Sequence, residues 1–232
     1  MPQYLTLPIA DCVFSAGYKN AKYQQTQGYR HYGVDVYGRT SQTVRACGNG
    51  TVIACGLDGS NEKTRLGNCV VIVYKDVMLH NGKTTDLACR MFHFASIAVK
   101  KGQEVKNGDI IGVAGNTGGT LVNGKPMGIH LHIEFDTDVK YPAYAVGIAS
   151  SGNVIKLGSV DSTVNPSVIW YLGANQKMAA QSALSAGWHT SADVLLPKIP
   201  SVKYTAYKLV GTYSTEAQAR TAAGSNGIVN KN

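Results

Sequence analysis

The stretch GIHLHIEF, residues 128–135, alternates apolar and polar side chains with a period of two. This pattern predicts a β-strand with one buried face, because successive side chains of a strand point to opposite sides of the sheet. One face receives three apolar side chains and the other three polar ones, namely Leu131, Ile133 and Phe135 against His130, His132 and Glu134. The two imidazoles, about 6.5 Å apart at the backbone, can supply two ligands to one metal ion, or one ligand and a supporting group. The alternative is a solvent-facing polar stripe on an edge strand.

A second stretch, HYGVDVYG at residues 31–38, places His31 and Asp35 four residues apart. A helix would bring both onto one face, but a glycine and two β-branched valines in this stretch disfavour a helix. In a straight strand the two residues would lie about 13 Å apart, too far to share one metal ion. Metal binding therefore requires a bend, for which Gly33 is suited. Otherwise His31 is a surface residue and Asp35 caps a strand.

Two histidines and one aspartate from different β segments would leave a fourth coordination position open to water. That composition is typical of a catalytic zinc centre, whereas a structural zinc site is closed by four protein ligands.

Strand patterns continue on both sides of these stretches. Runs rich in β-branched residues, TVRA, TVIACG and CVVIVY, alternate with turns over residues 43–75, and a second such block covers residues 91–135. The chain also has 26 glycines, with polar turn clusters about every ten residues. We therefore expect a mainly β fold built on antiparallel sheet.

Composition excludes several classes of protein. With 232 residues, 44% hydrophobic and 16% charged, the chain is neither disordered nor too short for a sizeable core. No run reaches the roughly 18 apolar residues of a membrane helix, so no membrane insertion is expected. The net charge of +8 indicates an anionic partner. Nucleic acid is not expected, because no cluster of arginines and aromatic residues accompanies the charge.

The five cysteines form no CxxC pair, so their spacing predicts no structural zinc cluster. Buried free thiols are the first interpretation, and a bridge between Cys47 and Cys55 across a hairpin is the second.

In order and together, these stretches resemble the lysostaphin-type (LytM-type) zinc metallopeptidases, which are peptidoglycan endopeptidases. The match runs over residues 28–172 through HYGVDVYG, VRACGNGTVIACG, GNCVVIVY, MFHF, VKKGQEVKNGDIIGVAGNTGG, GIHLHIEF and NPSVIWYL. The resemblance implies one Zn²⁺ per chain with His31, Asp35 and His132 as ligands. It implies catalytic roles for His93 and His130, and a sandwich-like antiparallel peptidase domain with a groove over the sheet.

The implied activity is hydrolysis of peptide bonds in the cross-links or stem peptides of bacterial peptidoglycan. The alternative is an inactive wall-binding or activator relative of the same fold. The family also places a tyrosine near the oxyanion, for which Tyr23, Tyr29 and Tyr32 are candidates. Glu134 is expected to support a ligand or to lie at the surface, and His80 and His189 are expected to be ordinary surface residues.

Two departures from the family put substrate preference in doubt. Met91-Phe92 replaces the usual aromatic and small residue before the catalytic histidine, and LVNGKPM lengthens the segment before GIHLHIEF.

Three parts are predicted along the chain: a peptidase domain at residues 1–172, a helix and Pro-containing linker at 173–200, and a small strand-helix segment at 201–232. The run ANQKMAAQSALSA, from residue 174 to 186, contains strong helix formers. The last part resembles half of a SPOR-type wall-binding repeat. Its alternative is a strand and helix that pack back onto the peptidase domain.

The N-terminal residues lack a standard secretory signal, since no Lys or Arg precedes Lys19. A wall peptidase made in the cytoplasm without a signal resembles a phage endolysin that is released through a holin and acts at the cell wall. A protein whose signal has been removed is the other interpretation. Anionic wall polymers are the expected partners of the positive charge. A biotinyl or lipoyl carrier, suggested by VKKGQEVKNGDIIG, lacks the lysine at the modified turn.

Overall fold

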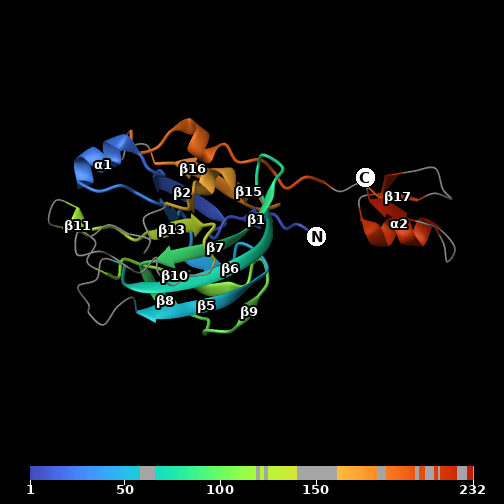
Figure 1. Ribbon diagram of the computed structural model, residues 1–232, viewed down its shortest axis with the longest axis horizontal. Coiled ribbons are helices and arrows are strands. Elements are labelled where there is room, and N and C mark those ends of the chain that lie inside the picture. Colours follow the sequence, from blue (N-terminus) through green and yellow to red (C-terminus); the bar gives the residue numbers. More distant parts are fainter. Residues whose placement is uncertain are drawn as a thin grey trace. The chain divides into compact units, whose positions relative to one another are not determined.

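The two stretches that carry the predicted ligands lie side by side as neighbouring strands in the middle of a large sheet (Figure 1). They are β3 (Val34–Gly38) and β13 (Leu131–Asp136). The computed structural model describes residues 1–57, 66–118, 121–122, 125–139, 161–181, 187–201, 204–206, 212–213, 215–223 and 229–231. These residues divide into two compact units, Met1–Pro197 and Lys198–Asn232.

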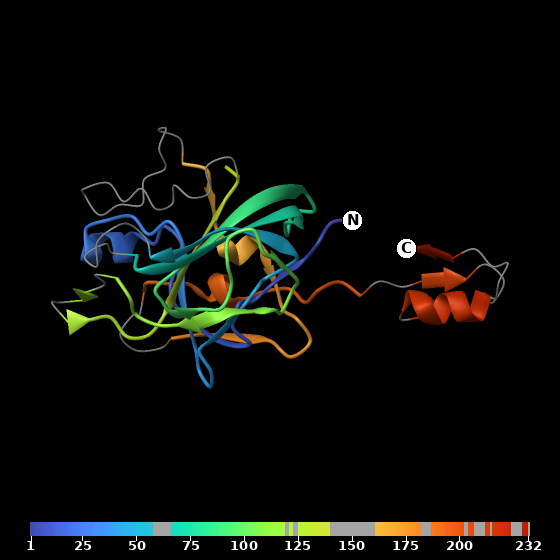
Figure 2. The same ribbon diagram turned by 90° about the horizontal axis from the view of Figure 1, so that it is seen from below.

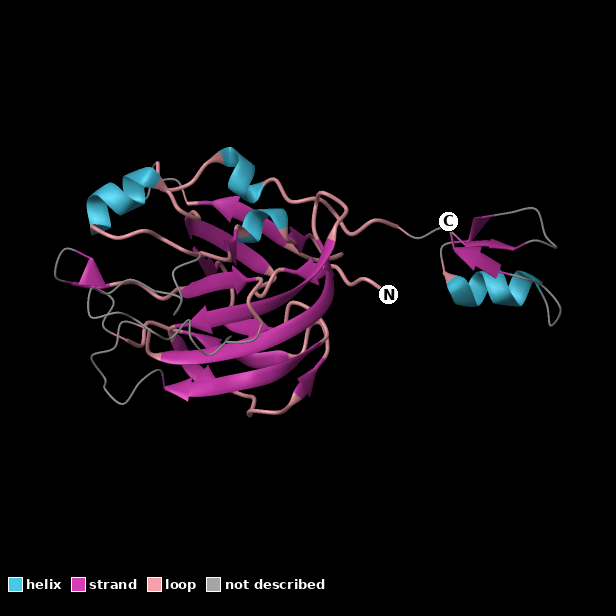
Figure 3. Cartoon of the chain, viewed as in Figure 1, coloured by secondary structure: helices cyan, strands magenta, loops and turns pink. Residues whose placement is uncertain are grey.

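In the described part of the first unit, the largest sheet has nine strands. Eight follow in the order β16 (Lys177–Ala180), β2 (Asp11–Ala16), β3, β13, β7 (Thr84–Phe92), β6 (Asn68–Met78), β5 (Gly50–Leu57) and β9 (Glu104–Val105), and β14 (Thr163–Val164) pairs with β13. All of these pairings are antiparallel except that of β16 with β2. The predicted mainly β, antiparallel fold is confirmed, and Figure 3 shows how few helices accompany the strands.

Smaller elements complete the first unit. A three-stranded sheet has the order β4 (Thr43–Arg45), β10 (Ile110–Ala114), β8 (Phe94–Ile97), and two short pairs join β1 (Leu5–Thr6) with β15 (Trp170–Tyr171) and β11 (Leu121–Val122) with β12 (Lys125–Pro126). The helices are α1 (Ala21–Gln27), η2 (Pro166–Val168) and η3 (Ser191–Val194). None of the helices within the described ranges is long and apolar enough to span a membrane.

Alternation along the central strands separates an apolar face from a polar one. Leu131, Ile133 and Phe135 of β13 are fully buried and join one hydrophobic core with residues of the three-stranded sheet, such as Phe94 and Ile111. The opposite side chains of β13 are polar and nevertheless buried. Because buried polar groups must find partners, this second face is where a site is expected.

The helix predicted from residue 174 to 186 is wrong over the described residues, because Lys177–Ala180 form the edge strand β16. Backbone hydrogen bonds to the free edge of β2 stabilise the strand more than the weak intrinsic helix preference of these residues stabilises a helix. Lys177 N–H donates to Ala10 O and Gln181 N–H to Phe14 O, continuing the ladder on both sides. Residues 182–186 of that prediction lie outside the described part, as do residues 140–160.

The first unit also extends past the predicted boundary at Leu172, up to Pro197. Leu196 is buried in the core, and Leu172 N–H donates to Pro197 O at 2.7 Å. The predicted linker at 173–200 is therefore wrong over most of its length, because an apolar side chain and backbone hydrogen bonds attach it to the sheet.

The second unit contains β17 (Tyr204–Ala206), β18 (Thr212–Tyr213), α2 (Glu216–Ala223) and β19 (Val229–Lys231). The strands are antiparallel in the order β18-β17-β19, and α2 lies along them (Figure 2). The Thr215 hydroxyl accepts a hydrogen bond from Gln218 N–H, which is a helix cap contact. Two short strands thus stand where one was predicted, and β19 was not predicted. Residues 207–211, between β17 and β18, are outside the described part.

Candidate metal centre

Strand pairing brings Asp35 and His132 together. In the sheet register His132 lies opposite Asp35 of β3 on one side and Phe92 of β7 on the other. His31 precedes β3, and the chain reaches the strand through Gly33, where an added Cβ would stand 2.2 Å from Ile133 O. The bend expected at Gly33 therefore has a specific cause: the backbone approaches β13 so closely that only glycine fits.

The structure brings the three predicted ligands into one small triangle. Asp35 Oδ1 lies 2.8 Å from His132 Nδ1 and 3.1 Å from His31 Nε2, and these two ring nitrogens are 3.0 Å apart. All three side chains are buried. Among the described residues, they are the group of at least three His, Cys, Asp or Glu residues whose atoms could hold one metal ion.

Hydrogen bonds on the far side of each ring set which nitrogen faces this triangle. His31 Nδ1 lies 2.8 Å from Gly17 O, so Nδ1 carries the proton and Nε2 the lone pair. His132 is arranged in the opposite sense, because its Nε2 lies 3.0 Å from Glu134 Oε1 and its Nδ1 faces the triangle. Glu134 is fully buried, which excludes the surface position considered for it and leaves the role of a partner to His132.

His93 and His130 stand next to this triangle. Their ring centroids are 4.7 Å apart, and the His93 centroid is 6.3 Å from that of His132. His93 Nδ1 lies 2.8 Å from Thr117 O, and His130 Nδ1 lies 2.9 Å from Gly128 O. A neutral ring that donates from Nδ1 keeps its lone pair on Nε2, so both rings can accept a proton there. His93 also has φ +69°, a left-handed backbone that is uncommon outside glycine.

Burial and neighbouring charges shift the pKa values in this group. Burial alone would raise the pKa of Asp35, but the nearby His31 and the hydrogen bond from His132 hold it well below its usual range. Burial lowers the pKa of His132, but hydrogen bonds to Asp35 and Glu134 outweigh that effect and raise it to about 9. Burial, with His130 and His132 close by, lowers the pKa of His93 to about 3. His93 is therefore uncharged at neutral pH.

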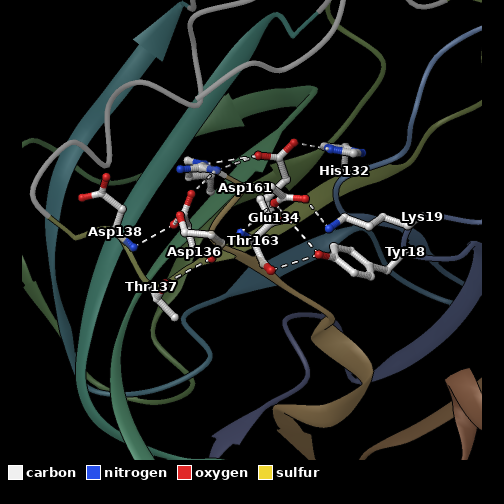
Figure 4. Close-up of polar contacts among 11 residues, drawn as sticks. Tyr18, Lys19, His132, Glu134, Asp136, Thr137, Asp138, Asp161 and Thr163 are labelled. Carbon is white, nitrogen blue, oxygen red and sulfur yellow. Dashed lines mark hydrogen bonds and ion pairs between the residues drawn. The ribbon is translucent and has the colours of Figure 1, made fainter. Parts of the chain in front are cut away.

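A buried charged network that the sequence motifs did not predict lies next to His132, on the side of Glu134. Arg90 of β7 donates to Glu134 Oε2 at 3.0 Å and to Asp136 Oδ2 at 3.1 Å, and Ser162 hydrogen-bonds to Asp136. Figure 4 labels His132, Glu134 and Asp136 of this network. Arg90 is opposite Glu134 in register. The signal was a single arginine within the apolar run LACRMF, since a lone charge on a buried strand requires a partner on the next strand.

The three tyrosine candidates differ in burial and in the residues that they contact. Tyr23 is buried and stacks on His31 with ring centroids 4.3 Å apart, and its hydroxyl lies 3.1 Å from that of Tyr29. Tyr32 is half-buried, with Lys19 Nζ 5.6 Å from its ring centroid. The choice of an oxyanion tyrosine stays a prediction. His189, expected at the surface, is half-buried and packs on Phe14.

Comparison with known proteins finds a family model whose matched range covers these residues. The model of Peptidase family M23 matches residues 29–143, a range that includes the triangle, His93 and His130. The chain carries a peptidase family M23 domain. A comparison with curated proteins found no match.

Solved structures similar to this chain include several M23 peptidases. A zinc-containing peptidase from Vibrio cholerae is 26% identical, with a TM-score of 0.42 over 58% of this chain and 37% of its own. The lysostaphin catalytic domain from Staphylococcus simulans is 23% identical, with a TM-score of 0.39 over 56% of this chain and 81% of that one. A prophage-encoded M23 catalytic domain from Enterococcus faecalis is 24% identical, with a TM-score of 0.40 over 55% and 82%. The chain thus spans just over a third of the Vibrio cholerae peptidase.

The donor set of the M23 domain fits a zinc ion. Tetrahedral Zn²⁺ with bonds of about 2.0–2.1 Å to nitrogen and oxygen separates its ligand atoms by about 3.3 Å. The three donor atoms already stand 2.8–3.1 Å apart, so movements of a few tenths of an ångström would accommodate the ion. Two imidazoles and one carboxylate are ligands that zinc accepts in catalytic sites. Binding would release the proton that His132 holds, because zinc requires the neutral ring.

Proposed function

We propose that this protein is a zinc-dependent endopeptidase that hydrolyses peptide bonds in the cross-links or stem peptides of bacterial peptidoglycan. One observation carries the proposal. In the M23 domain a buried triangle of three zinc-type donor atoms lies beside two histidines whose Nε2 atoms hold lone pairs. A closed structural site would have no use for two further titratable rings, yet the His93 centroid lies 6.3 Å from that of His132 and 4.7 Å from that of His130.

The ligand positions are assigned to His31, Asp35 and His132. A zinc ion held there supplies a Lewis acid that polarises the scissile carbonyl and makes water acidic enough to attack it at neutral pH. Gly17 O and Glu134 fix the orientation of the two ligand rings, because each accepts the proton on the ring's far nitrogen. Such partners raise ligand basicity and hold the ring in place.

His93 and His130 are assigned to proton transfer and to stabilisation of the oxyanion. His93 Nδ1 donates to Thr117 O, so the ring has a lone pair on Nε2 that can take a proton from the attacking water. Once protonated, the pair can donate hydrogen bonds to the tetrahedral oxyanion and return a proton to the leaving amine. The hydrogen bond from His93 to Thr117 O keeps the ring oriented throughout.

Two further parts of the proposal concern the partner and the place of action. Peptidoglycan carries anionic wall polymers, and the net charge of +8 favours adsorption to them. The second unit is proposed as a wall-binding element, in keeping with its resemblance to half of a SPOR-type repeat. The protein would then act at the cell wall, as a phage endolysin does.

The test is digestion of purified peptidoglycan from several wall types, followed by mass spectrometry of the released fragments. The zinc-loaded protein is expected to produce new peptide amino termini, which name the bond, and to lose this activity with chelator and regain it with zinc. His93→Ala, loaded with zinc, serves as the control for contaminating hydrolases. No release from any wall by a protein that binds zinc would favour the inactive wall-binding relative instead.

A further inference from the structure

A segment outside the family match contacts the residues that hold His31. We call residues 187–197 the C-terminal strap; it contains η3 and ends the first unit. The M23 match stops at residue 143, so the strap lies outside the matched range. It follows β16, which pairs in parallel with β2.

Trp188 of the strap touches the two residues that position the His31 ring. Its carbonyl oxygen accepts a hydrogen bond of 2.8 Å from Gly17 N–H. Its indole packs edge-on against Tyr23, with ring centroids 4.9 Å apart and planes at 70°. Trp188 is half-buried, because these contacts cover part of its surface.

Gly17 lies between the strap and the metal centre. Its N–H faces Trp188, while its carbonyl oxygen accepts the Nδ1 proton of His31. A Cβ at this position would stand 3.1 Å from both Trp188 O and Asp193 Oδ2, closer than side chains usually pack. The strap therefore fits against a backbone with no side chain, and the fit fixes the carbonyl that sets the His31 tautomer.

Tyr23 forms the second connection. Its ring stacks on His31 at 4.3 Å with planes at 27°, and α1, which carries it, is capped by Asn20. With Gly17 O at the ring edge and Tyr23 on the ring face, His31 has two restraints besides its ligand partners. Both of them touch Trp188.

We propose that Trp188 is a positioning residue of the metal centre, which holds Gly17 and Tyr23 against His31 and so keeps Nε2 of that ring aimed at the metal position. This inference rests on the proposed zinc function. It makes the strap part of the working peptidase unit, although the strap lies more than forty residues beyond the family match.

The experiment compares zinc affinity in full-length Trp188→Ala, Trp188→Phe and the unaltered protein, by competition with a chromophoric chelator. Loss of an outer partner of a metal ligand typically costs 10- to 100-fold in affinity, and we expect about 10-fold for Trp188→Ala. Trp188→Phe keeps an aromatic edge against Tyr23 and is expected to restore most of that loss. The control is Leu196→Ala, which removes a buried side chain of the same strap and is expected to lower the melting temperature but not the zinc affinity.

A second readout does not depend on zinc. In the metal-free protein, long-range ¹H–¹⁵N NMR is expected to show His31 protonated on Nδ1. Trp188→Ala keeps the backbone carbonyl that bonds Gly17 but removes the indole that packs against Tyr23, and loosening of the strap is then expected to give a mixture of His31 tautomers. Equal zinc affinity in Trp188→Ala and the unaltered protein, or an equal loss in Leu196→Ala, would overturn the inference. If the unaltered protein binds no zinc, the proposed function fails, and the tautomer of His31 still decides whether Trp188 positions it.

Discussion

His132 and His93 have the same side chain, but their positions relative to the three donor atoms differ. His132 Nδ1 lies within 3.0 Å of both other donor atoms, whereas His93 reaches the site only as a neighbouring ring. We expect His132→Ala to lose bound zinc, and His93→Ala to keep one zinc per chain and lose peptidase activity. Metal content after dialysis, measured by plasma mass spectrometry, checks both. Equal zinc loss in the two variants would make His93 a ligand.

A substitution at Glu134 tests how its negative charge affects zinc affinity through His132. Glu134→Gln keeps the size of the side chain and an oxygen for His132 Nε2–H, but removes the negative charge that makes the ring a stronger ligand. Zinc affinity is expected to fall by about 10-fold. Glu104→Gln changes an exposed carboxylate that bonds Thr51, and should leave the affinity unchanged. A similar drop in both variants would show that overall charge, not this contact, controls binding.

The backbone at His93 is itself open to measurement. With φ +69°, a residue with a Cβ costs roughly 1–2 kcal/mol that glycine does not. Among variants that have lost the imidazole, His93→Gly should therefore be more stable than His93→Ala by about 1 kcal/mol in urea denaturation. Glycine and alanine normally rank the other way within a strand or helix, so equal stabilities, or the usual ranking, would show that the left-handed backbone is absent.

At the scale of strands, Arg90 ties β7 to β13 through two buried carboxylates. The paired charges have a high desolvation cost, so removing one partner destabilises far more than the pair itself stabilises. Arg90→Met fills a similar volume but leaves Glu134 and Asp136 without their counter-charge. We expect a loss of about 3–5 kcal/mol in the free energy of unfolding. Arg39→Met at an exposed position should change it by less than about 0.5 kcal/mol. A small effect of Arg90→Met would mean that water reaches the network.

The elements predicted correctly are those in which local pattern and tertiary position agree. Alternation in GIHLHIEF gave both the strand and its polar face, and the glycine and valines of HYGVDVYG argued against a helix that indeed does not form. The run around Met178 has strong helix formers but forms a strand, because the vacant edge of β2 is a long-range feature that no local window contains. The same limit explains why Gly17 and Trp188 were missed.

For the whole molecule, the order of motifs predicted the fold but not the extent of the folded unit. The five residues that the motifs single out lie near one another in the structure, and their roles stay a prediction. A boundary at Leu172 follows from where the resemblance ends. The structure adds β16 and the C-terminal strap, whose contacts with β2, Gly17 and η2 come from side chains and backbone groups distant in sequence. Sequence motifs mark the chemistry of a site more clearly than the scaffold that a given chain builds around it.

Truncation tests this extent of the unit. A chain that ends at Pro197 should keep the melting temperature, zinc affinity and soluble-peptide cleavage of the full protein, because the first unit is intact. A chain that ends at Leu172 exposes the β2 edge and loses Leu196 from the core, so we expect several kcal/mol of lost stability. Calorimetry on both chains decides, and equal melting temperatures would show that the strap contributes little to stability.

Co-sedimentation of the Pro197 chain with purified cell walls tests which unit binds the wall. Weaker pelleting with cleavage unchanged would place wall binding in the second unit. Undiminished pelleting would place it on the M23 domain and its positive charge.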